Sequence, residues 1–352
     1  RFDARHYRTI VEGGYAYRTP APGERLEQNI AFFPLYPLTC RPLAGLLGPN
    51  VAMVALSHLY TLAAVLLLYT WLRRRIDHPA ALLAVAAVLC WPAGVYTAFG
   101  YAESLTLLLF TATIILLDRQ RWWLAAIVCG LATATRPTAA ALVPVVLLAY
   151  WMHGPGPRTR RTALLVPLGL LAAAGLIGYF GYLWHAFGSP GVYSENFRNG
   201  WVPAEARGTW LEYLTLANVW SQLRYWGRVL GVLVGFPMGL VELAIPRVWN
   251  IPLTAFGLLL CLGGLRRVPP RFRPLLWLGP LTFVQAYLAS GGATFGILPI
   301  ARYMSVVVPA MVVLGAWMAR EWSPAARHFT LAGFVVLQAC WAFHFTLTEW
   351  PG

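Results

Sequence analysis

Long apolar runs, separated by short arginine clusters, dominate this chain of 352 residues. Each run of about 20 residues is long enough to cross a hydrocarbon core about 30 Å thick as a helix. Hydrophobic residues make up 59% of the chain and charged residues 11%, whereas a soluble domain is about 45–50% apolar and about 25% charged. The pattern predicts an all-α polytopic membrane protein.

The arginine clusters divide the chain into successive crossings, because positively charged loops stay on the cytoplasmic side. The clusters are Arg73 to Arg75, Arg119 with Arg121, Arg158 with Arg160 and Arg161, Arg266 and Arg267 with Arg271 and Arg273, and Arg320 with Arg327. This rule predicts about ten spans, at 51–72, 79–97, 100–117, 122–135, 137–152, 162–186, 250–265, 273–290, 301–319 and 326–347. The formal charge of +14 therefore indicates contact with anionic lipid headgroups and not with nucleic acid.

This topology makes residues 1–352 a single transmembrane domain with two external segments. Residues 1–50 form an external loop and re-entry, so we expect a further span before residue 1. Residues 187–249 form a long external loop. Within it, 211–230 is typical of an interfacial amphipathic helix. We expect 229–246 to be re-entrant or interfacial, because a full crossing there would place the next arginine cluster outside.

The opening RFDARHYRTIVEGGY is polar in a chain with few acids. Asp3, His6 and Tyr7 lie close together there, and a carboxylate beside the bilayer can act as a general base. The simpler alternative is that Asp3 is a solvated acid of a loop and takes no part in catalysis. In the following AFFPLYPL, Pro34 and Pro37 would break a helix, and irregular backbone at membrane depth survives only in contact with protein or a cavity. We therefore expect 31–38 to wall a pocket beside Asp3.

Three further charged residues fall at the outer ends of predicted spans. Glu103, in FGYAESLTLLLF, is either functional, as intramembrane acids commonly are, or a helix cap. Arg136, in GLATATRPTAAAL, needs a partner such as an anionic headgroup or Glu103, unless it snorkels to the interface. Arg302, in GILPIARYMSVVVPAM, is placed similarly. Guanidinium groups match phosphate geometry, so we expect Arg136 and Arg302 to hold a lipid phosphate together.

Several kinds of chemistry have no support in the sequence. The five cysteines are scattered and lie mostly within apolar runs, which is typical of packing residues and not of a disulfide framework or a metal site. Neither a phosphate-binding glycine loop nor a dinucleotide-binding motif is recognisable. The sequence therefore predicts no metal and no other cofactor, and ATP or nucleotide-sugar chemistry has no visible support.

Four segments in order resemble the PIG-V (GPI mannosyltransferase II) family of the GT-C membrane glycosyltransferases, in a bacterial form. They are FDARHY with GGY and AFFPLYP, then GYAESLTLLLF, then RQRWWLAAIVCGLATATRPTAAALVP, and finally PIARYMSVVVPA. Together they cover most of residues 1–310. The resemblance implies a GT-C-like helical bundle, external loops that carry short interfacial helices, and a helix before the catalytic loop.

The resemblance also implies an inverting glycosyltransferase, and first of all a mannosyltransferase, that moves a sugar from polyprenyl phosphate to an acceptor hydroxyl. In this family pattern Asp3 is the catalytic base and an arginine stabilises the leaving phosphate. The residues assigned to substrate binding are His6, Tyr7, Glu103, Arg136, Arg302 and Tyr303. Phe2 stands where the family usually has Trp, and Ser189-Pro190 stands where relatives often have Asp-Pro. These departures bear on the substrate more than on the fold.

The expected location is the bacterial plasma membrane, with the site on the extracytoplasmic face. The expected partners are the polyprenyl-phosphate-linked donor, a lipid, glycan or protein acceptor, and membrane lipids. One alternative is a lipid or sugar transporter or flippase, which would show paired broken helices in two related halves. Another is a non-catalytic homologue that only binds polyprenyl lipid. The gathering of polar anomalies on one face favours the transferase.

Overall fold

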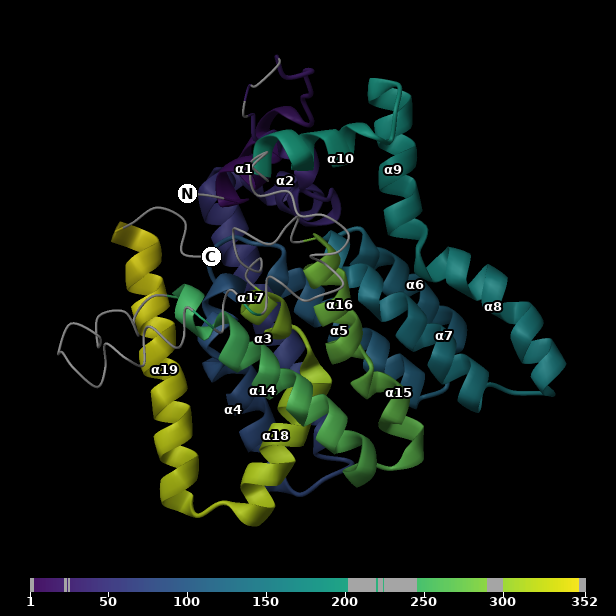
Figure 1. Cartoon of the computed structure of the whole chain (residues 1–352), viewed down its shortest axis with the longest axis vertical. Coiled ribbons are helices and arrows are strands. Elements are labelled where there is room, and N and C mark those ends of the chain that lie inside the picture. The colour runs from purple at the N-terminus through teal and green to yellow at the C-terminus, as the bar shows by residue number, and fades with distance from the viewer. Residues whose placement is uncertain are drawn as a thin grey trace.

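The computed structural model describes residues 3–21, 24, 26–201, 220, 224, 246–289 and 300–347, and every regular element among them is a helix. The all-α prediction is confirmed. In Figure 1, α1 (Asp3–Gly13), α2 (Leu35–Leu47) and α10 (Val192–Asn196) lie at the upper end of the bundle. The connection between α18 (Val308–Glu321) and α19 (Pro324–Leu347) lies at the lower end.

The predicted spans fall on helical segments in the predicted order. These are α3 (Pro49–Leu72), α4 (His78–Cys90) with η2 (Pro92–Thr97), α5 (Glu103–Asp118), α6 (Trp122–Thr133), η3 (Pro137–Ala141) with α7 (Leu142–His153), α8 (Arg158–Ala172) with α9 (Ala174–Phe187), α14 (Pro246–Arg267), α15 (Arg273–Leu276) with α16 (Leu278–Ala289), α17 (Ile300–Met304) with α18, and α19. A short turn, η6 (Pro270–Phe272), precedes α15.

Few of these segments could cross a membrane as one uninterrupted helix. Among the described residues, α3 and the part of α14 at Val248–Arg267 are long and apolar enough, and α8 with α9 adds a third if their 55° bend lies within one span. The other segments are shorter, less apolar or interrupted. The predicted count of spans is therefore not confirmed, although their positions along the chain agree with the helices.

The segment predicted as an external loop begins with a helix, α1, which was not predicted from the sequence. In α1 the buried residues are Asp3, His6, Tyr7, Ile10 and Val11. This spacing of three and four places them on one helical face. Asp3 and His6 occupy positions of the buried face that are usually apolar in an amphipathic helix. The helical spacing of apolar residues is therefore interrupted and is not recognisable from the sequence.

The prolines of 31–38 begin a helix and do not break one. After η1 (Asn29–Ala31), residues 32–34 are irregular, as expected, but Pro34 is the N-cap of α2 and Pro37 lies in its first turn. Backbone N–H groups of a first turn have no partner within the helix, so proline is tolerated there. Leu35 N donates to the Ala134 carbonyl at 2.9 Å, which ties this helix start to the turn before Arg136.

The second predicted external segment, 187–249, is described in part. It contains α10 and a π-helical turn, η4 (Phe197–Trp201). Buried hydrogen bonds between Asn196 and Gln28, and from the Tyr179 hydroxyl to the Ile30 carbonyl, join this region and α9 to the N-terminal segment. The predicted amphipathic helix at 211–230, except Trp220 and Arg224, and nearly all of the predicted re-entrant stretch at 229–246 lie outside the described residues.

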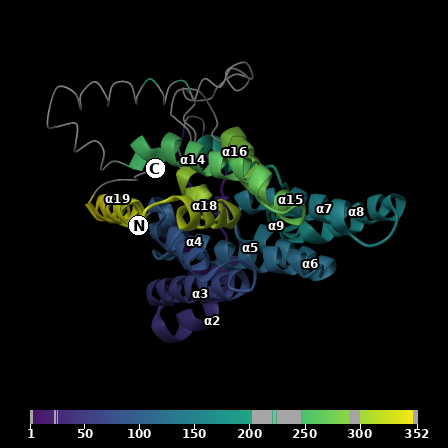
Figure 2. The same cartoon turned by 90° about the horizontal axis from the view of Figure 1, so that it is seen from below.

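The helices form layers. Figure 2 shows α14 and α16 on one side, α18 and then α4 and α5 in the middle, and α3 and α2 on the other side. The pairs α18–α4, α3–α5 and α2–α3 are in contact. The approach of α18 to α4 depends on Gly315, where an added Cβ would lie 2.3 Å from the backbone nitrogen of Ala84. Small residues allow such close helix packing inside a membrane.

We therefore predict that Gly315→Ala destabilises the protein. The methyl group has to push α18 away from α4, and overpacking of this kind costs about 1–3 kcal/mol. Gly333→Ala, in α19, is the matched control, because an added Cβ there meets no atom within 4 Å. Thermal unfolding of the purified protein measures both variants, and equal stability of the two would contradict the packing argument.

Candidate active site

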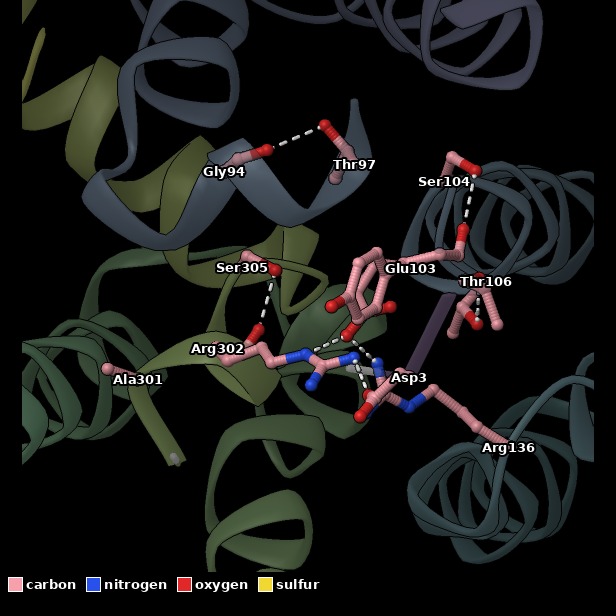
Figure 3. Close-up of polar contacts among 12 residues, drawn as sticks. Asp3, Gly94, Thr97, Glu103, Ser104, Thr106, Arg136, Ala301, Arg302 and Ser305 are labelled. Carbon is pink, nitrogen blue, oxygen red and sulfur yellow. Dashed lines mark hydrogen bonds and ion pairs between the residues drawn. The ribbon is translucent and has the colours of Figure 1, made fainter. Parts of the chain in front are cut away.

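Four charged side chains from distant parts of the chain meet in one cluster (Figure 3). Arg302 Nη2 lies 2.7 Å from Asp3 Oδ2, and Arg302 Nε donates to Glu103 Oε1. Arg136 Nη1 lies 2.6 Å from the same Glu103 oxygen. The structure thus places Asp3, Glu103, Arg136 and Arg302 in a single ion-pair network, which we call the charge quartet.

Each member of the charge quartet stands at the end of a helix or in a short one. Asp3 and Glu103 are the first residues of α1 and α5. At this position the positive end of the helix dipole stabilises a carboxylate. The capping interpretation of Glu103 and the functional one are therefore compatible. Arg136 has extended backbone and precedes Pro137, which begins η3. Arg302 lies in the five-residue helix α17.

The charge quartet is buried. The exposed fraction is 0% for Glu103, 3% for Arg302, and 8% for both Asp3 and Arg136. Burial of a charge is costly unless the charge is paired, and here two carboxylates face two guanidinium groups. Arg136 is buried against Glu103 and does not snorkel to the interface.

Tyrosine rings cover both guanidinium groups. Arg302 Cζ lies 4.6 Å from the centre of the Tyr96 ring and 4.8 Å from that of Tyr101. Arg136 Cζ lies 4.7 Å from the centre of the Tyr303 ring. Such cation–π contacts stabilise a cation, and more strongly when it is desolvated. Tyr303 thus contacts the charge quartet, as its position next to Arg302 in the sequence suggested.

Sequence reasoning missed Tyr96 and Tyr101. A signal was present, because the stretch PAGVYTAFGYAES places two tyrosines just before Glu103. The turn between them uses Gly100, whose φ of +76° is in the left-handed region that glycine adopts most readily. The stretch could have been read as a loop folded against Glu103.

His6 and Tyr7 hold α1 in place beside the charge quartet. The His6 ring stacks on Phe32, with centroids 4.8 Å apart, and Tyr7 makes edge contacts with Phe32 and Tyr36. Burial, and then the charge of Arg5, lowers the pKa of His6 to about 4. His6 is therefore neutral at pH 7. These contacts place residues 32–36 directly against α1.

The environment of Asp3 acts on its proton affinity in two directions. Burial raises the pKa of the Asp3 carboxyl, the nearby Arg302 guanidinium lowers it, and the Glu103 carboxylate raises it. The net result is a pKa above the ordinary value of 3.8. A raised pKa strengthens a carboxylate as a proton acceptor.

Metal-ligating side chains are not grouped in the part of the chain that the structure describes. No three His, Cys, Asp or Glu side chains there could hold one metal ion. The five cysteines are free thiols, and Cys40, Cys129 and Cys261 are buried, consistent with the predicted packing role.

Comparison with known proteins finds similarity to mannosyltransferases. Residues 34–181 match the family described as dolichyl-phosphate-mannose-protein mannosyltransferase. GPI alpha-1,6-mannosyltransferase 2 of Cricetulus griseus is 32% identical over 159 residues, which is 42% of this chain and 30% of that protein. The Homo sapiens protein is 30% identical over 164 residues, 43% of this chain and 30% of its own length. The chain thus spans less than a third of the length of these curated relatives.

Solved structures agree on the fold. ArnT from Cupriavidus metallidurans, bound to undecaprenyl phosphate, aligns with a TM-score of 0.53 at 17% identity, over 97% of this chain and 59% of that one. The Archaeoglobus fulgidus oligosaccharyltransferase aligns with a TM-score of 0.51 at 14% identity, over 96% of this chain and 48% of that one. This chain shares the fold of these two solved structures. The predicted resemblance to the PIG-V family and the predicted GT-C-like fold are confirmed.

We predict that Glu103→Gln strongly destabilises the protein. The substitution leaves two buried guanidinium groups with one carboxylate, and breaking a buried ion pair in this way costs about 3–5 kcal/mol. The control is Glu12→Gln, because Glu12 is an exposed acid of α1 whose ion-pair partner among the described residues is the exposed Arg8. The free energy of unfolding of both variants is the measurement.

A double variant separates charge from packing. Adding Arg136→Gln to Glu103→Gln restores the balance of buried charge, so the double variant should be more stable than the sum of the two single losses predicts. Strict additivity would mean that the two residues do not interact.

Proposed function

We propose that this chain is an inverting mannosyltransferase that uses a polyprenyl-phosphate-linked donor. The observation that carries the proposal is Asp3, a buried carboxylate of raised pKa at the start of a helix, paired with Arg302. Two comparisons support the donor class. The curated relatives are named as mannosyltransferases, and the ArnT structure holds undecaprenyl phosphate.

In the proposed reaction Asp3 is the general base. Its carboxylate accepts the proton of the acceptor hydroxyl as the hydroxyl oxygen forms a bond to the anomeric carbon. The bond from that carbon to the phosphate oxygen breaks, and polyprenyl phosphate leaves with the electron pair. Attack opposite the leaving group inverts the anomeric configuration. Arg302 keeps the carboxylate in position and partly offsets the effect of burial on its pKa.

Arg136 and Arg302 have the chemistry to stabilise the leaving phosphate. The phosphate gains negative charge as the bond breaks, and guanidinium groups already in place stabilise it without reorganisation. Arg136 Nε is buried and has no hydrogen-bond partner among the described residues, so this donor is unused, and a phosphate oxygen would reach it only after the covering side chains move. Tyr303 covers the face of Arg136. Glu103 positions both guanidinium groups and balances their charge before the donor binds.

The remaining assignments follow from the same geometry. His6 and Tyr7 lie on the helical face of Asp3, and we assign them to the substrate-binding region together with Tyr303. The acceptor is a hydroxyl of a lipid, a glycan or a protein. The site faces the extracytoplasmic side of the bacterial plasma membrane, because the arginine clusters end the helices that begin near the charge quartet.

We predict that Asp3→Asn removes turnover without removing donor binding. Loss of a general base lowers the rate by about 10²–10⁴-fold, and the amide keeps the size of the side chain. Glu12→Gln on the same helix is the control and should retain wild-type turnover. The assay is transfer from polyprenyl-phosphate mannose by the purified full chain.

Two outcomes of this assay contradict the proposal. Full turnover by Asp3→Asn would exclude Asp3 as the base. Donor binding by the wild-type chain without turnover on any acceptor would identify a non-catalytic homologue.

The pH dependence provides a separate prediction. Asp3 must be ionised to accept a proton, so kcat/KM falls as the pH drops through its pKa, and the raised pKa places this limb above pH 3.8. Arg302→Gln should move the limb to higher pH, because the charge that lowers the pKa is lost. Arg302→Lys keeps that charge and should move it less. An acid limb at the same pH in all three proteins would rule out this role for Arg302.

A further inference from the structure

A cavity lies at the other end of the bundle from the charge quartet. Its volume is about 240 Å³, and residues of α3, α5, α14, α15 and α18 line it. Asp118, which pairs with the cavity-lining Arg75, ends the helix α5 that begins with Glu103. The two sites are thus separated by the length of that helix, about 22 Å at 1.5 Å per residue. The proposed transfer reaction makes no use of this cavity.

The cavity is lined by aliphatic side chains, which we call its apolar floor, and by aromatic rings. Ile114, Leu276 and Val312 are among its apolar lining residues, and the indole rings of Trp71 and Trp317 line it as well. An engineered cavity of about 150 Å³ lined by apolar side chains holds benzene. A space of this size and lining therefore accommodates a segment of a hydrocarbon chain.

Arginines surround the same cavity. The lining includes Arg75, Arg267, Arg271 and Arg320. Arg75 is bound to Asp118, so its charge is balanced within the protein. Arg267 lies 3.6 Å from Glu321, with both side chains more than half exposed, and such exposed pairs are weak.

The other two lining arginines, Arg271 and Arg320, lie at the exposed edge of the cavity, which we call its rim. Arg271 and Arg320 are exposed, and Arg271 Cζ lies 4.6 Å from the centre of the Phe272 ring. Asp118 balances the charge of Arg75, and Glu321 balances that of Arg267. The positive charges of Arg271 and Arg320 at the rim are then not balanced by these acids. A phosphate group matches guanidinium donors in charge and in geometry.

We propose that this cavity binds one anionic membrane phospholipid, with its phosphate at Arg271 and Arg320 and an acyl-chain segment on the apolar floor. A lipid without a phosphate would leave the two rim charges without a partner, and a zwitterionic lipid would bring its own cation to the same rim. A free phosphate would leave the apolar floor in contact with water. Basic pockets between transmembrane helices on the cytoplasmic side commonly bind anionic headgroups. Three of the five arginine clusters contribute to the lining of this cavity, through Arg75, through Arg267 with Arg271, and through Arg320.

The test uses the full chain, purified in detergent and titrated with phosphatidylglycerol, phosphatidylcholine or inorganic phosphate, with bound ligand counted by native mass spectrometry. We expect phosphatidylglycerol to bind, and the paired substitution Arg271→Gln with Arg320→Gln to weaken it by about tenfold or more. The matched control is Arg158→Gln with Arg160→Gln, which removes two exposed arginines of α8 that do not line the cavity.

A filling variant tests the apolar half of the site. Ala316 lines the cavity, and Ala316→Phe should weaken phosphatidylglycerol binding with all the arginines in place. Val312→Phe is the second filling variant, for use if Ala316→Phe does not fold.

Each contrary result overturns the proposal. Equal binding of phosphatidylcholine would exclude recognition of the charge. An equal loss in the α8 control would indicate a general surface effect. Unchanged binding in folded filling variants would place the acyl chain elsewhere, and inorganic phosphate that competes at the same concentration would show that the chain contributes nothing.

Discussion

The structure around the site depends on one carboxylate oxygen. Glu103 Oε1 is shared by Arg136 and Arg302, and Arg302 in turn holds Asp3. Four segments that are distant in the sequence, at residues 3, 103, 136 and 302, are joined through this contact in a buried setting. A charge in such a setting is stable only while its partners stay in place. The network therefore specifies how α1, α5, η3 and α17 must meet.

The same network explains how a cluster of charged side chains can exist inside a hydrophobic bundle. Apolar helices supply no directional contacts of their own, whereas ion pairs and cation–π contacts orient side chains. The rings of Tyr96 and Tyr101 flank Arg302 and exclude water from a group that would otherwise be solvated. The result is a set of oriented donors and a base of raised pKa before any substrate arrives.

The sequence predicted the helical class, the order of the spans and the residues of the charge quartet, because charges are rare enough in apolar runs to be noticed individually. It did not predict that one oxygen would join Arg136 to Arg302, since local patterns carry no information about contacts between residues so far apart. The helix α1 was missed because Asp3 and His6 occupy its buried face. Pro37 was misread because its position in the first turn of α2 is visible only once the start at Leu35 is known. Tyr96 and Tyr101 were overlooked because aromatic residues are common throughout this chain.

The length of α5 has a consequence for the depth at which the proposed reaction would take place. If the arginine-rich end lies level with the headgroups of one leaflet, a helix of about 22 Å stops roughly 8 Å short of the far edge of a hydrocarbon core about 30 Å thick. Asp3 would then work below the outer surface, at the bottom of a depression in the bilayer. A lipid carrier could present its sugar there without leaving the membrane, whereas a water-soluble acceptor would have to descend to meet it.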